Sequence, residues 1–153
     1  MHSLAELIRF NESHAARELA DFDQELFRQA QAKGGLDEPA YVSARDAARH
    51  AARDQGIDAA LAKDRLDAIA TLTCGPAWLI DPVNGDSDSG GCSTPAAVAG
   101  YPHVTVPAGH IRGLPVGLSF FGTAFSEPKL LQLASGFEAV SAARRRPEFA
   151  RSA

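Results

Sequence analysis

The sequence has 153 residues, 45% of them hydrophobic, and a formal net charge of −4. Such a chain fits one domain of ordinary size with enough apolar side chains for a core. Neither half carries the basic surplus of a nucleic-acid surface. The only basic cluster, Arg144 to Arg146, follows a predicted helix, where cations are favoured.

The sequence shows neither a membrane span nor a secretion signal, and this bears on the cellular location of the protein. No apolar run reaches 18 residues, so no membrane span is expected, and no signal-peptide pattern opens the chain. Cys74 and Cys92 lie apart without a metal-binding spacing. We therefore expect a cytoplasmic protein with two free thiols.

Residues 1–66 are expected to be helical. Ser3 and Glu6 have capping-box spacing ahead of a first helix. Further helices are predicted over Asp23 to Lys33, over Ala40 to Arg53 and around Leu61. Gly34, Gly35 and Gly56 are expected to end helices, and Asp58 to cap the last one.

Residues 67–125 are expected to hold a sheet and a long loop. Ala68 to Leu72 is predicted to be a buried strand, and the loop from Thr73 to Gly91 is long enough to suggest a function. Two more strands are predicted at Val104 to Val106 and Val116 to Phe121, with both faces covered. A turn region rich in Gly and Pro, Pro107 to Pro115, separates them.

Residues 126–145 are predicted to form a C-terminal helix. Its apolar side chains are predicted to share one inner face, and they are Leu130, Leu131, Ala134 and Phe137. The order of the elements indicates an α/β or α+β fold. We expect the α/β class, with helices packed on a small mixed sheet, as a single domain over residues 1–153.

A calcium loop is one interpretation of Asp86 to Gly91, because alternate carboxylates open such loops. Gly90 stands where a third ligand is needed, however, and Ala97 where the closing Glu belongs. A solvated loop with Asx turns is the favoured interpretation, and no metal or other cofactor is expected. The five histidines also lack metal-ligand spacing.

A local nucleophile is the second interpretation we considered. Gly91 to Pro95 begins like a serine nucleophile elbow but has Pro where the closing Gly belongs. Cys92 would be activated if residues 93–99 form a helix, with His103 or His110 as its base. The favoured alternative is that Cys92 is a small buried or pocket-lining residue.

The stretch from Thr94 to Gly122 contains the wording Ala-Val-Ala-Gly-Tyr-Pro-x-Val-Thr-Val-Pro-Ala-Gly and then Gly-Leu-Pro-Val-Gly-Leu-Ser-Phe-Phe-Gly. This wording closely resembles the C-terminal part of the amidase signature family. Shorter stretches agree in the family's order, among them Gly75-Pro-Ala-Trp78 and Asn84-Gly-Asp86. The resemblance runs from about Ser3 to Arg146.

The resemblance implies a fragment of the amidase signature fold without its catalytic residues. Family members cleave carboxamide C–N bonds with a Ser nucleophile, a second Ser in a cis peptide and a Lys, all in the N-terminal half. Lys33, Lys63 and Lys129 lie on predicted helices, and none precedes a Ser-Ser signature. No catalytic residue is therefore carried over, and the chain is expected to be inactive alone.

In the family, the C-terminal part completes the central sheet and forms one wall of the pocket for a small amide substrate. Pocket positions implied here are Cys74, Gly75, Trp78, Gly91, Cys92, Ser93 and Thr94. Trp78 has a second interpretation as a core or loop anchor. The free sheet edge should favour self-association, and the alternative function is a non-catalytic binding or assembly module.

Overall fold

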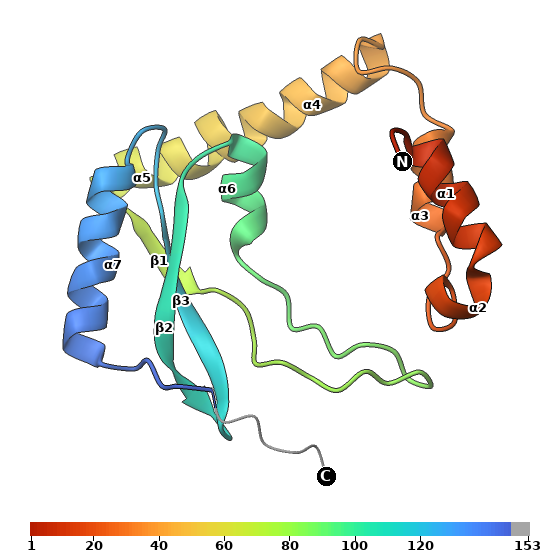
Figure 1. The fold of residues 1–153 in the computed structure, drawn as a ribbon. Helices are drawn as coiled ribbons and strands as arrows, with labels where there is room; N and C mark the ends of the chain where they lie inside the picture. Colours follow the sequence, from red (N-terminus) through yellow and green to blue (C-terminus); the bar gives the residue numbers. More distant parts are fainter. Residues whose placement is uncertain (148–153) are drawn as a thin grey trace. The chain divides into compact units, whose positions relative to one another are not determined.

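A computed structural model describes residues 1–147 of the chain (Figure 1). Residues 148–153 of the predicted domain lie outside the described residues. The chain divides into two compact units, Met1–Ala44 and Arg45–Ala153. Helices make up the first unit, and the second holds the sheet.

The first unit is a short helical assembly held together by polar contacts. It contains α1 (Leu4–Ser13), α2 (Ala15–Glu18) and α3 (Glu25–Gln31). The Ser3 hydroxyl accepts a hydrogen bond from the N–H of Glu6 at 3.2 Å, which confirms the Ser3 half of the predicted capping box. The Glu6 carboxylate accepts from the His2 N–H instead, at 2.7 Å. Gln24 is 5% exposed, accepts from the Asn11 amide at 3.0 Å and donates to the Ile8 carbonyl at 3.2 Å. Because its buried amide is paired at both ends, Gln24 ties α3 to α1.

One helical run continues through the predicted break at Gly56. It consists of α4 (Pro39–Ala52), the π-helical turn η1 (Arg53–Ile57) and α5 (Asp58–Asp64). The prediction that Gly56 ends a helix is wrong: a Cβ there would lie 2.8 Å from the Ala51 carbonyl oxygen, so glycine lets the wide turn form without a break. The prediction that Asp58 caps α5 is also wrong, because its carboxylate instead accepts from the Tyr101 hydroxyl at 2.8 Å.

The second unit is built on three antiparallel strands in the order β1-β3-β2. They are β1 (Ile69–Leu72), β2 (His103–Ile111) and β3 (Leu114–Phe121). All three predicted strands are confirmed, but the turn predicted over Pro107 to Pro115 is wrong. β2 continues past Pro107 because it is an edge strand with a register shift between Pro107 and Gly109. The turn contains only Arg112 and Gly113, whose φ angles of 50° and 85° suit a two-residue hairpin.

Different helices cover the two faces of this sheet (Figure 1). On one face α7 (Glu127–Ser141) forms a core whose buried members are Val106, Phe120, Leu130 and Ala134. On the other face the core between α6 (Ser93–Ala99), η1 and α5 consists of Ile57, Leu61, Ala96, Ala99 and Phe121. The predicted fold of helices on a small sheet is thus confirmed, and the sheet itself is antiparallel.

The coverage of the sheet is less complete than predicted. Leu72, Ile111 and Leu114 are 60%, 49% and 42% exposed, at the end of the sheet away from the Phe121 core. β1 is half-buried only at alternate positions. On α7, Leu130 is 1% exposed but Leu131 is 60% exposed, so the prediction that both share the inner face is wrong for Leu131. The open end of the sheet is where the candidate site lies.

Candidate functional site

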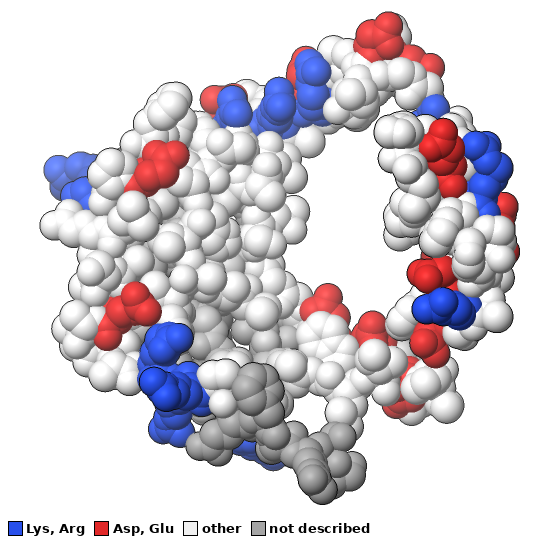
Figure 2. Space-filling model, in the orientation of Figure 1, with Lys and Arg blue, Asp and Glu red and all other residues white. Residues whose placement is uncertain are grey.

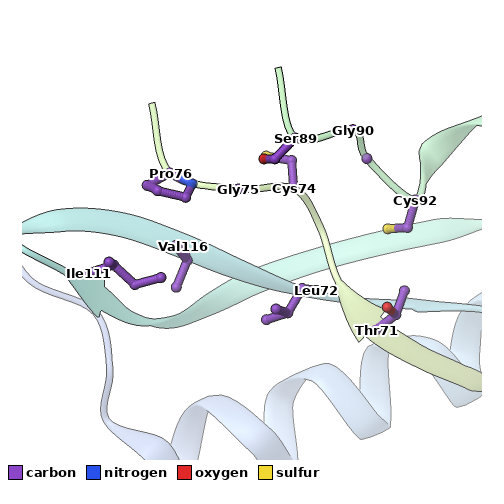
Figure 3. A pocket seen from close by; sticks show the side chains of 11 residues that line it. Thr71, Leu72, Cys74, Gly75, Pro76, Ser89, Gly90, Cys92, Ile111 and Val116 are labelled. Atoms are coloured by element: carbon purple, nitrogen blue, oxygen red, sulfur yellow. The ribbon is translucent and has the colours of Figure 1, made fainter. Parts of the chain in front are cut away.

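A pocket of about 540 Å³ lies where the loop after β1 returns to the sheet (Figure 3). Its lining residues are Thr71, Leu72, Cys74, Gly75, Pro76, Ser89, Gly90, Gly91, Cys92, Ile111 and Val116. The strands supply its apolar side chains, and the two ends of the loop supply small residues and backbone. None of these side chains carries a charge.

Backbone pairing holds the two ends of the loop together. The N–H of Thr73 donates to the Gly117 carbonyl at 2.8 Å, which continues the register of β1 with β3 by one residue. The N–H of Cys92 then donates to the Thr73 carbonyl at 3.0 Å, beside an isolated antiparallel bridge between Cys74 and Gly91. The loop between them therefore leaves and rejoins the sheet at one point, and the pocket forms there.

A cluster of hydroxyl groups lies next to this junction. The hydroxyl of Thr73 is 2.5 Å from that of Thr105 on β2 and 2.8 Å from that of Ser119 on β3. Ser119 is fully buried, so its hydroxyl needs a partner, and Thr73 supplies one. The cluster ties the end of β1 to both other strands and so positions Cys74 and Cys92 at the rim of the sheet.

The structure brings together only part of the set of pocket residues predicted from the sequence. Cys74, Gly75, Gly91 and Cys92 all line the pocket. Ser93 is the first residue of α6, and Thr94 lines a separate apolar groove with Pro95 and Val98. Trp78, 42% exposed, lines another hollow in the loop with Asp81 and Asn84.

The strand residues of the pocket were not predicted from the sequence. Thr71 and Leu72 come from β1, Ile111 and Val116 from either side of the β2–β3 hairpin. No local motif marks these four residues. Only the pairing of β1 with β3 brings the loop beside the hairpin, because these segments are more than 30 positions apart in the sequence.

The sequence left open whether His103 or His110 lies next to Cys92, and the structure places His103 there. Its sulfur lies 3.8 Å from Nε2 of His103, the first residue of β2. The imidazole of His103 also leans on the ring of Phe121, with centroids 5.6 Å apart. Cys92 is half-buried, whereas Cys74 is exposed, and both are free thiols. Residues 93–99 do form a helix, α6, as the nucleophile hypothesis required.

The acidic loop has the geometry expected of Asx turns. The carboxylate of Asp88 accepts from the Gly90 N–H at 2.8 Å, and that of Asp81 accepts from the N–H groups of Val83 and Asn84, each at 2.9 Å. The side-chain amide of Asn84, followed by these backbone bonds, lowers the pKa of Asp81. Among residues 1–147, no three His, Cys, Asp or Glu side chains lie together as a metal site would require.

The chain is similar to known amidases over nearly its whole length. No family model matches it. A probable amidase from Arabidopsis thaliana is 36% identical over 151 residues, covering 97% of this chain and 26% of the relative. The solved structure of native peptide amidase from Stenotrophomonas maltophilia is 53% identical, with a TM-score of 0.86, over 97% of this chain and 30% of that one. A peptide amidase in complex with the competitive inhibitor chymostatin is 52% identical over the same shares, with a TM-score of 0.90.

The chain therefore spans less than a third of the length of each of these relatives. Within the part of the chain that the structure describes, no helix has the length and apolar character needed to cross a membrane.

Proposed function

Because the chain belongs to the amidase signature family and matches 26% to 30% of the length of its relatives, we propose that it forms a wall of an amidase substrate pocket. In the complete enzyme that pocket would hold a carboxamide whose C–N bond is hydrolysed. The observation that carries the proposal is the 53% identity to a peptide amidase over 97% of the chain, with a TM-score of 0.86.

The lining of the pocket suits an uncharged amide. Leu72, Ile111 and Val116 offer apolar surface, and the segments around Cys74 and Gly91 offer backbone beside it. An apolar cleft with a few polar groups at fixed positions is the usual form of a small-molecule site. Since two of the matched structures are peptide amidases, we favour the amide of a peptide as the substrate class.

We propose further that this chain does not hydrolyse amides by itself. In the family a Lys takes the proton that the nucleophilic Ser gives up. Here Lys129 pairs with Asp67 at 3.1 Å, Lys33 and Lys63 are exposed, and none of the three lines the pocket. The base and nucleophile would then come from the part of the relatives that this chain does not match.

Activity assays on the purified 153-residue chain test the inactivity. Incubated with a peptide amide and with acetamide, the chain should release no ammonia above the buffer background. Ammonia release that survives rigorous purification and is lost in Cys92→Ala or Ser93→Ala would overturn this part and favour a local nucleophile.

A chimaera tests the wall itself. This chain would replace the matched stretch of the Stenotrophomonas peptide amidase, and the chimaera should hydrolyse a peptide amide. Ile111→Arg places a charge in the pocket and should lower kcat/KM by at least about tenfold. The matched control is Val140→Arg on α7, also at an exposed aliphatic side chain but outside the pocket, which should leave kcat/KM unchanged. A chimaera that folds but is inactive would favour the alternative, a non-catalytic binding or assembly module.

We also propose that the isolated chain associates with itself and binds no nucleic acid. Both outer strands of the three-stranded sheet, β1 and β2, present edges, and free edges pair with other strands. On the face shown in Figure 2, the surface over the sheet unit is mostly uncharged, and its few Lys and Arg side chains form no broad basic stripe. Two free cysteines fit a cytoplasmic location.

A further inference from the structure

The contact between Cys92 and His103 has no part in the proposed amidase function. The Cys92 sulfur lies 3.8 Å from Nε2 of His103, within reach of a hydrogen bond to sulfur. Both residues flank α6 in the second unit: Cys92 precedes α6, and His103 begins β2 directly after the turn that follows α6. His110, the other candidate base, is paired with Pro115 near the far end of β2.

The pocket gives small molecules access to this thiol. Cys92 is one of the residues that line the pocket, and Figure 3 shows its sulfur pointing toward the interior of the pocket from the start of α6. The pocket, at about 540 Å³, is large enough for a small reagent to approach the sulfur. The imidazole also lies beside the ring of Phe121, with ring centroids 5.6 Å apart.

We propose that Cys92 and His103 form a reactive thiol–imidazole pair, and that Cys92 is a covalent modification site for small thiol-directed electrophiles of the haloacetamide class. With its proton on Nδ1, the neutral imidazole presents Nε2 as an acceptor. A base next to a thiol is the arrangement that activates a cysteine nucleophile. The inference is independent of the proposed amidase function, because it needs no turnover.

Iodoacetamide would alkylate the Cys92 thiol in one displacement step. The Cys92 sulfur attacks the methylene carbon, forming the C–S bond as the C–I bond breaks. Iodide leaves with the bonding electron pair, and the thiol proton passes to Nε2 of His103, which releases it to water. The product is a stable thioether that carries a carboxamide, and the imidazole returns to its neutral form.

Alkylation rates measured on the full chain test this proposal. The chain is treated with iodoacetamide at one neutral pH, and peptide mapping by mass spectrometry gives the rates at Cys92 and Cys74 in the same sample. Accessibility alone predicts that the exposed Cys74 reacts faster. The pair predicts that Cys92 reacts faster, despite being half-buried.

Two variants test whether the imidazole of His103, rather than the general surroundings of Cys92, speeds the alkylation of Cys92. His103→Gln keeps most of the side-chain bulk but cannot take the proton, and it should lower the alkylation rate of Cys92 about tenfold. This is less than the 10²-fold or more that is typical of a positioned base, because the contact between sulfur and imidazole is long. The matched control, His110→Gln on the same strand, should change neither rate. The Cys74 rate and the far-UV circular dichroism report whether each variant is folded.

Two results would overturn the proposal. One is a folded His103→Gln chain whose Cys92 rate equals that of the wild type. The other is a wild-type chain in which Cys92 reacts more slowly than Cys74, and this comparison decides the question even if His103→Gln fails to fold.

Discussion

Shortening Leu130 to alanine should destabilise the second unit far more than the same change at the neighbouring Leu131. Leu130 is 1% exposed and packs between α7 and the sheet, against Val106 and Phe120. Leu→Ala at such a site loses the transfer free energy of the removed atoms and leaves a cavity, together about 2.7–5 kcal/mol. Because whole domains are stable by only about 5–15 kcal/mol, this is a large share of the total.

Urea unfolding followed by far-UV circular dichroism measures the effect. With an m-value of about 1–3 kcal/mol per molar urea, a loss of about 3 kcal/mol lowers the midpoint by about 1–3 M. Leu130→Met, which conserves volume, should cost less than about 1.5 kcal/mol.

Leu131→Ala is the matched control, because the same atoms are removed one position along the same helix. Leu131 is 60% exposed, so little apolar surface returns to water and no closed cavity forms. Alanine is also the better helix former, and the expected change is below about 1 kcal/mol. Equal losses at the two positions would refute the packing of α7 on the sheet through Leu130.

Three further predictions concern other parts of the chain. The hydrogen bond to Asp58, followed by desolvation, raises the pKa of Tyr101 above its usual 10. The contribution of Tyr101 to the free energy of unfolding is therefore full below pH 10 and is lost as the pH rises through the pKa of the folded state. Tyr101→Phe should lower the urea midpoint at neutral pH and reduce its fall in alkali; an unchanged alkaline profile would count against this. Trp78, 42% exposed, should show red-shifted fluorescence that acrylamide quenches readily, and a blue-shifted, protected emission would favour the anchor interpretation instead. Light scattering should find dimers or larger species at micromolar concentration, whereas a compact monomer at all concentrations would refute association through the sheet edges.

The elements of the fold were predictable wherever the signal is local. The Ser3 cap acts on the N–H three residues away, and the β-branched run at Val104 to Val106 favours a strand over any nearby alternative. The outcome at Leu130 and Leu131 was not predictable in the same way. Neighbouring residues on a helix differ by only about 100° in direction, so periodicity brings both near the apolar face, and only the position of the sheet decides which one is buried.

The ends of elements were predicted less well, because they depend on distant partners. Glycine ends many helices, yet Gly56 here occupies a π-helical turn. The residue that follows that turn, Asp58, accepts a hydrogen bond from Tyr101 on another segment. Pro107 was expected to lie in a turn. Its missing N–H is harmless in β2, because that strand forms an edge of the sheet, and edge position is a property of the whole sheet rather than of the surrounding residues.

The sequence by itself singled out candidate residues along one segment of the chain and left open which other segments lie beside them. The family resemblance singled out Cys74, Gly75, Gly91 and Cys92 at the two ends of one loop, but not Pro76, Ser89 and Gly90 beside them in the same pocket. Three features depend on distances between chain segments. They are whether Trp78 shares this pocket, which strand residues face it and which histidine lies next to Cys92. Those distances follow from strand pairing, which is stabilised by hydrogen bonds and buried surface between residues far apart in the chain. Only the tertiary structure therefore decided them.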